Sequence, residues 1–138
     1  MKKITVAVVV DDLCGMLLFG KRQSKDRVLI AEFMEYAADR PVFVGNFSKK
    51  LFESYEGVTM CENPLEDAPD GAICFIENFP LTPYLSLVNE LIIYRWNRLY
   101  HSDVKLDVDP KAAGYKLSSV SEFAGSSHDR ITKEIYVR

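Results

Sequence analysis

A dense polar run in the first quarter of the chain has the residue types of an anion-binding site. Lys21, Arg22, Lys25 and Arg27 stand with Asp26 in one seven-residue stretch, just before a predicted helix. A helix N-terminus presents unpaired N–H groups and a partial positive charge, so cations placed beside it can add to anion binding. A charged run is more often a solvated loop, and we weigh the loop above the anion site.

A second polar group surrounds the single tryptophan. Arg95, Asn97 and Arg98 flank Trp96 at the end of a predicted strand. Ligands usually bind at strand ends in open α/β sheets, so a flat ligand could stack there. A tryptophan is more often part of core or edge packing, and we expect Trp96 to pack.

The stretch Ser126-Ser127-His128-Asp129 contains the side-chain types of a hydrolase triad. Neighbours in one loop point in different directions, whereas a triad is assembled across a fold. We therefore expect local hydrogen bonds between side chains and backbone in this loop. The chain has two histidines, His101 and His128, and neither stands with a cluster of cysteines or carboxylates at ligand spacing, so the sequence predicts no metal site.

Composition indicates one compact globular domain over residues 1–138, with 48% hydrophobic and 27% charged residues. A net charge of -3 gives no electrostatic reason to bind nucleic acid. The apolar run 4–10 is too short to cross a membrane and no signal cleavage site follows it, so we expect no membrane association. Three cysteines without CxxC spacing favour the reducing cytoplasm.

Apolar runs and helical periodicity divide the chain into alternating strands and helices. Residues 4–10 form a β-branched run that predicts a central strand buried on both faces. Residues 11–23 read as a long loop, and Ser24 is a plausible N-cap for a helix through Ala38. The predicted sheet-facing stripe of that helix contains Leu29, Phe33, Tyr36 and Ala37.

The remaining elements complete an α/β pattern. We expect further strands at 41–45, 58–61, 72–77 and 90–96, a short helix capped by Ser48, and a helix opened by Thr82-Pro83. The strands 115–123 and 131–138 are expected to pair as an antiparallel ribbon. The fold class is therefore α/β, with a central mixed, mostly parallel sheet, helices on both faces and a C-terminal antiparallel strand pair.

Several segments resemble dihydrofolate reductases. The apolar strand ending in Asp11, with Gly15 after it, resembles the first strand and substrate loop of that family. Residues 41–54 are similar to its strand, Gly-Arg-x-Thr turn and Trp-Glu-Ser helix. Residues 89–96, 102–104, 117–119 and 135–138 resemble its later strands, so the resemblance spans nearly the whole chain. It implies a dihydrofolate reductase-like fold and makes NADPH a candidate cofactor.

The resemblance also identifies cofactor positions, and these are altered. The turn that binds NADPH phosphates in the family reads Gly45-Asn46-Phe47-Ser48 here, so the arginine is replaced while a hydroxyl remains. The paired glycines that let the backbone approach the pyrophosphate are replaced by Glu77 and Asn78. A carboxylate at this place should repel a phosphate.

The proton-donating acid of the family is also replaced. Its buried carboxylate falls on Leu29, which cannot carry a proton. Asp26 and Glu32 lie one helical turn on either side and are the candidate substitutes. Phe33 matches the family's ring-contacting aromatic residue.

These observations lead to three hypotheses. The first is a dihydrofolate reductase-like protein that is not a competent reductase and uses the cleft of the fold to bind a small ligand or a partner. The second is an NADPH-dependent reductase of altered specificity, with Ser48 and Arg22 or Arg27 on the cofactor. The third is a non-catalytic scaffold that forms homo-oligomers through an edge strand. The expected cleft residues are Gly15, Arg22, Arg27, Leu29, Phe33, Tyr94, Arg95 and Asn97.

Overall fold

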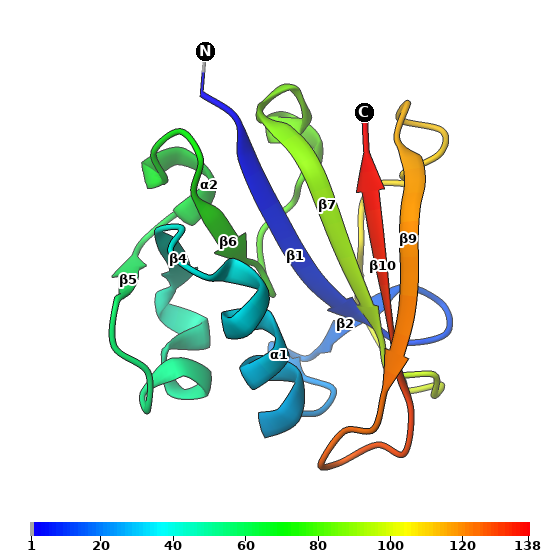
Figure 1. Cartoon of the computed structure of the whole chain (residues 1–138). Helices are drawn as coiled ribbons and strands as arrows, with labels where there is room; N and C mark the ends of the chain where they lie inside the picture. The colour runs from blue at the N-terminus through cyan, green and yellow to red at the C-terminus, as the bar shows by residue number, and fades with distance from the viewer. Residues whose placement is uncertain (1) are drawn as a thin grey trace.

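The computed structural model describes residues 2–138 and contains a seven-stranded mixed sheet (Figure 1). Its strands, in spatial order, are β5 (Val58–Cys61), β4 (Val42–Gly45), β6 (Ile73–Phe75), β1 (Ile4–Val10), β7 (Val88–Arg95), β10 (Ile131–Val137) and β9 (Lys116–Phe123). The first five run parallel, and β10 pairs antiparallel with both β7 and β9. The predicted mixed sheet and its C-terminal antiparallel pair are confirmed.

The central position of β1 follows from its continuous apolar sequence. Six of its seven residues are buried, and its neighbours are β6 and β7. Side chains alternate between the two faces, so Val6 and Val8 join one core cluster while Ala7 joins the other. A strand covered on both faces needs apolar residues at every position, as the sequence predicts.

The helix α1 (Arg27–Ala37) covers one face of the sheet (Figure 1). It begins after Asp26, whose carboxylate accepts the N–H groups of Val28 and Leu29, so the predicted cap at Ser24 is wrong. The stripe predicted to face the sheet is largely present. Of its predicted members, Leu29, Phe33 and Ala37 are buried and Tyr36 is half-buried, and Ile30, which the prediction did not include, is buried as well.

The opposite face is covered by shorter elements. These are α2 (Pro64–Asp67) and the 3₁₀-helix Thr82–Leu87, which pack with the loop containing Leu106 and Val108. A second 3₁₀-helix, Asn46–Phe52, follows β4. Ser48 lies inside this helix and does not cap it, because the helix starts three residues earlier than predicted.

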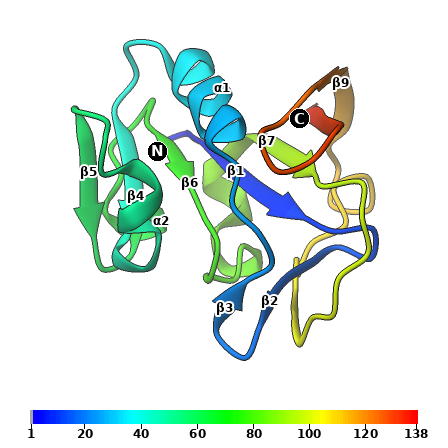
Figure 2. The ribbon, with the colours of Figure 1, turned by 90° about the horizontal axis from the view of Figure 1, so that it is seen from below.

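Residues 11–23 do not form the long loop that the sequence predicts. They contain β2 (Gly15–Leu18) and β3 (Lys21–Arg22), which pair as a hairpin, and β8 (Val104–Lys105) pairs with β2 to complete a small sheet. Figure 2 shows this hairpin on the side of β1 opposite α1. Strands of two to four residues carry little periodic signal, and β8 lies some 90 residues away in sequence.

The strand β9 forms one edge of the large sheet. Seven of its eight residues are exposed, including Leu117 and Val120. A register irregularity between Ile135 and Tyr136 interrupts its pairing with β10. Bulges of this kind twist an edge strand and hinder pairing with another chain. In residues 2–138, no helix has both the length and the hydrophobicity needed to cross a membrane.

Candidate functional site

A small cavity lies next to Arg22 and Leu29, two of the residues predicted to line the cleft. It is enclosed by the β2–β3 hairpin, the N-terminal end of α1 and the ends of β1, β6 and β7, and its volume is about 20 Å³. This is room for about one or two water molecules. The apolar wall includes Val9, Met16, Leu29, Ile30, Phe75 and Trp96, and the polar wall includes Arg22, Gln23, Asp26 and Glu77.

Several residues predicted to line the cleft lie elsewhere. Phe33 is buried behind the cavity, with its ring edge-on to Phe75 at 5.2 Å. Arg95 forms an ion pair with Glu134 at 2.8 Å and lines a separate groove with Cys14. Neither Phe33 nor Arg95, both expected in the cleft, contributes to the wall of this cavity.

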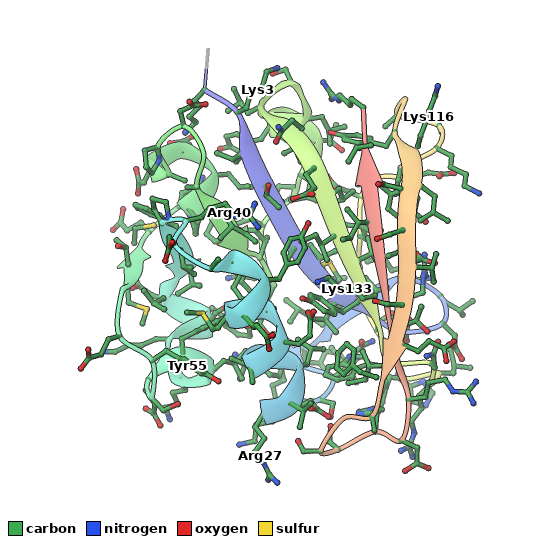
Figure 3. All side chains as sticks on the ribbon, viewed as in Figure 1. Lys3, Arg27, Arg40, Tyr55, Lys116 and Lys133 are labelled. Atoms are coloured by element: carbon green, nitrogen blue, oxygen red, sulfur yellow. The ribbon has the colours of Figure 1, made fainter. Side chains whose placement is uncertain are left out.

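The same correction applies to four more residues. The N–H of Gly15 donates to Asp11, and the side chain of Asn97 donates to Thr132. Tyr94 is fully buried on the α1 side of the sheet. Arg27 is exposed and extends away from the N-terminal end of α1 (Figure 3).

Arg22, Glu77 and Ser48 form a closed polar cluster, which we call the Arg22 clamp. The guanidinium binds Glu77 through Nε–Oε1 and Nη2–Oε2 contacts of 2.9 Å each. Ser48 Oγ donates to Glu77 Oε2 at 2.7 Å. Arg22 also lies over the Phe47 ring, 4.8 Å from its centroid, and donates to the Phe47 carbonyl. A two-point Arg–carboxylate contact is among the strongest side-chain pairs, so the clamp holds the hairpin against the sheet.

The positions that resemble the NADPH phosphate site do not fit a phosphate. The hydroxyl of Ser48 is buried and already donates to Glu77. Asn46 and Asn78 are exposed. A side chain at Gly45 would place its Cβ 3.1 Å from the Phe79 ring, so this glycine makes room for an aromatic residue of the same chain. Residues 45–48 carry no positive charge, and Arg22 is paired with Glu77.

A carboxylate of this chain also binds the backbone at the start of the 3₁₀-helix Thr82–Leu87. Asp107 accepts the N–H of Leu81 at 2.9 Å and that of Thr82 at 3.0 Å. Burial alone would raise the pKa of Asp107, but these hydrogen bonds outweigh it and hold the pKa below its usual value. The N–H groups that could contact an anionic ligand are therefore already occupied.

Asp26 lines the cavity as a fully engaged carboxylate. Besides the two N–H groups of α1, it accepts the backbone N–H of Ser127 at 2.7 Å and the hydroxyl of Ser127 at 2.9 Å. Burial alone would raise its pKa, but hydrogen bonds from Ser126, Ser127 and Leu29 hold the pKa well below its usual range. An acid that remains ionised at neutral pH is a poor proton donor, so this environment argues against the predicted catalytic role.

Glu32 does not reach the cavity. Its carboxylate accepts the Tyr94 hydroxyl at 2.5 Å and forms an ion pair with Lys133 at 2.8 Å, between α1 and the sheet. Lys133 lies on the face of β10 that faces α1 (Figure 3). Burial, followed by the hydrogen bond to Glu32, raises the pKa of Tyr94 strongly. Glu32 therefore does not lie in the cavity, where a substitute for the family acid would have to stand.

A chain of hydrogen bonds leads from Asp26 to a second loop. Ser127 Oγ lies 2.8 Å from His128 Nδ1, and His128 Nε2 lies 2.7 Å from the Tyr100 hydroxyl. Because Asp26 can only accept, the single Ser127 hydroxyl proton points to it, so Nδ1 donates to Ser127 and Nε2 accepts from Tyr100. The serine stands between the acid and the histidine, which is not the order of a hydrolase triad.

His128 also stacks on Trp96, with ring centroids 4.4 Å apart. Both residues line an open depression of about 570 Å³, which shares Trp96 with the closed cavity. Burial lowers the pKa of His128, the charge of Arg98 lowers it further, and Asp26 and Asp129 oppose the shift. The neutral imidazole is therefore the favoured form in the folded protein.

This environment predicts a loss of stability at mildly acidic pH. A folded-state pKa below the unfolded value of about 6.5 means that the unfolded chain binds the proton first. The contribution of His128 should be complete above about pH 7 and lost as pH falls through the folded pKa. Urea unfolding from pH 8 to pH 5 measures it. The variant His128→Gln should flatten this decline, and His101→Gln, at an exposed histidine, should retain it.

Sequence reasoning missed the roles of Asp11, Asp107 and Gln23. Asp11 is fully buried and accepts the N–H groups of Leu13 and Gly15, which shapes the turn into β2. An aspartate two to four residues before a glycine is a turn signal that could have indicated this role. Nothing local in the sequence identifies Asp107 as a partner for residues 81 and 82.

Comparison with known proteins supports the fold alone. No protein-family model and no curated protein matches the sequence. Among solved structures, a dihydrofolate reductase from Enterococcus faecalis, complexed with NADP(H) and RAB-propyl, matches with a TM-score of 0.69 and 11% sequence identity. The match covers 99% of this chain and 96% of that one. The chain therefore has a dihydrofolate reductase-like fold, as the sequence resemblance predicts.

Proposed function

We propose that this protein is a non-reducing member of the dihydrofolate reductase-like fold that binds a small ligand in the cavity behind the Arg22 clamp. One observation carries the proposal: the groups that a reductase would need free are bound to other groups of the same chain. Arg22 and Ser48 are bound to Glu77 in the clamp, and Asp26 is bound by α1 and Ser127. Leu29 lines the cavity at the position where the resemblance places the reductase acid.

The alternative of an NADPH-dependent reductase is favoured by the NADP(H)-bound reductase that shares the fold. It requires Ser48 and Arg22 to leave Glu77 and bind the cofactor, and Asp107 to leave the backbone of Leu81 and Thr82. Breaking a partly buried, two-point ion pair is costly. These requirements weigh against the reductase.

The alternative of an oligomeric scaffold is favoured by the small cavity volume and the exposed β9 edge. The irregular pairing of β9 with β10 weighs against edge-to-edge assembly. We therefore place the scaffold behind the ligand-binding protein. Cys14, Cys61 and Cys74 are free thiols, which supports the expected cytoplasmic location.

NADPH titration tests the proposal. We expect no saturable change in Trp96 fluorescence over micromolar NADPH and no oxidation of NADPH in the presence of dihydrofolate. Trp96 lines the cavity, so a nicotinamide ring bound there should alter its emission. The Trp96→Phe variant supplies the blank for absorption by NADPH itself. Saturable quenching in the wild-type protein, together with turnover of dihydrofolate, would overturn the proposal.

A further inference from the structure

Gln23 enters the cavity wall with an amide whose orientation is fixed. Its Nε2 donates to Asp11 Oδ2 at 3.1 Å. Burial alone would raise the pKa of Asp11, but the backbone N–H groups of Gly15, Tyr100 and Leu13 and the Gln23 amide hold it below its usual value. An ionised carboxylate accepts and never donates, so the amide cannot turn its oxygen toward Asp11.

The other end of this amide therefore lacks a partner. Gln23 Oε1 is buried, and within residues 2–138 it is the one buried side-chain nitrogen or oxygen without a hydrogen bond. Buried acceptors are almost always paired, by protein, water or ligand. Because Gln23 lines the cavity, a molecule in the cavity is the partner that remains available.

The rest of the wall restricts what that molecule can be. Arg22 is neutralised by Glu77, and Asp26 is saturated by N–H and O–H donors. Val9, Phe75 and Trp96 are apolar or aromatic. Lys25, the remaining charged residue of the wall, is exposed to solvent. A charged ligand would lose its hydration and find no buried, unpaired counter-charge in this wall, which is unfavourable.

We propose that the cavity recognises a compact, neutral, flat molecule that donates an N–H or O–H hydrogen bond to Gln23 Oε1. This inference rests on the proposed function, because it assumes that the cavity is a ligand site. Gln23 supplies specificity, and the apolar wall supplies affinity. A ligand that lacks the donor leaves the buried oxygen unpaired and is discriminated against.

The cavity must widen to admit a ring. Met16 lies in β2, is buried and lines the cavity. Methionine is flexible and adapts to irregular space, so its side chain is the part of the wall most easily displaced. The variant Met16→Ala removes most of that side chain and opens the cavity without changing Gln23 or Asp11.

The experiment compares pairs of probes in which a methyl group replaces the donor hydrogen. Phenol and anisole, and pyrrole and N-methylpyrrole, are titrated into the wild-type protein and into Met16→Ala. Binding is followed by ligand-detected NMR and Trp96 fluorescence. We expect phenol to bind about tenfold more tightly than anisole, the size of a hydrogen bond to a buried acceptor. The double variant Met16→Ala with Gln23→Met should bind both probes equally.

Each outcome decides a different claim. Equal binding of phenol and anisole to Met16→Ala would overturn the donor requirement while leaving the cavity as a ligand site. If no probe binds to the wild-type protein or to Met16→Ala, the donor requirement is also overturned, and the result would indicate that water alone satisfies Gln23 Oε1. Failure of the proposed function is detected separately, as saturable NADPH binding and turnover. Thermal melting of each variant confirms that it is folded before the titrations are compared.

Discussion

Replacing Asp26 with alanine should lower the free energy of unfolding by about 3 kcal/mol. The carboxylate caps α1 by accepting two backbone N–H groups, and it also accepts the N–H and hydroxyl of Ser127. The loss of the cap contributes about 1 kcal/mol, and hydrogen bonds from buried donors to a charged group contribute the rest. Denaturant unfolding followed through Trp96 fluorescence measures the change.

Two variants serve as controls for Asp26→Ala. Ser24→Ala removes the residue that the sequence suggested as the cap, and it should change stability by no more than about 0.5 kcal/mol. Asp26→Asn keeps an acceptor for the helix N–H groups but loses the charge, so its effect should fall between the other two. Equal destabilisation by Ser24→Ala and Asp26→Ala would contradict the assignment of the cap.

Replacing Lys133 with methionine should destabilise the protein by about 2–3 kcal/mol. The Lys133 side chain is 6% exposed, and its Nζ lies 2.8 Å from Glu32 and 3.6 Å from the centroid of the Tyr36 ring. Without Lys133, the Glu32 carboxylate remains between α1 and the sheet with the Tyr94 hydroxyl as its partner. This loss is smaller than the roughly 3–5 kcal/mol typical of fully buried pairs, because the Glu32 side chain is 30% exposed.

A double-mutant cycle separates the ion pair from simple packing. The combination of Glu32→Leu with Lys133→Met should be less destabilising than the sum of the single changes, because it leaves no unpaired charge. Lys116→Met is the matched control, since Lys116 is an exposed lysine of the neighbouring strand β9 (Figure 3). Additive single changes, or an equal effect of Lys116→Met, would contradict a role for the buried pair.

The sheet could be predicted because its strands carry their own signal. The runs Ile4–Val10 and Val58–Cys61 have the predicted bounds, and the C-terminal antiparallel pair forms as expected. β-branched and apolar runs bounded by turn residues identify strands without reference to partners. The resemblance to dihydrofolate reductases then provided the order of the elements.

The hydrogen-bond and ion-pair partners of Asp26 and Glu32 could not be predicted, because they come from residues distant in the sequence. Ser24 and Asp26 are both residue types that cap helices well. The structure uses Asp26, whose carboxylate also accepts the N–H of Ser127, 101 residues away in the sequence. Glu32 and Lys133 are separated by the same distance in sequence. Spacing along a helix predicts which residues share a face, but it does not predict which strand supplies a partner.

The contact of Asp107 with the backbone of Leu81 and Thr82 has a consequence for any anion that would bind at these two N–H groups. Because the Asp107 carboxylate belongs to the same chain, it competes with any free anion for these N–H groups at an effective concentration on the order of millimolar or higher. A phosphate group at these N–H groups would have to displace this resident carboxylate, even after Glu77 had been replaced by glycine. A variant designed to bind an anion here therefore needs coordinated changes at Glu77 and Asp107, which lie 30 residues apart in the sequence, and neither change alone should suffice.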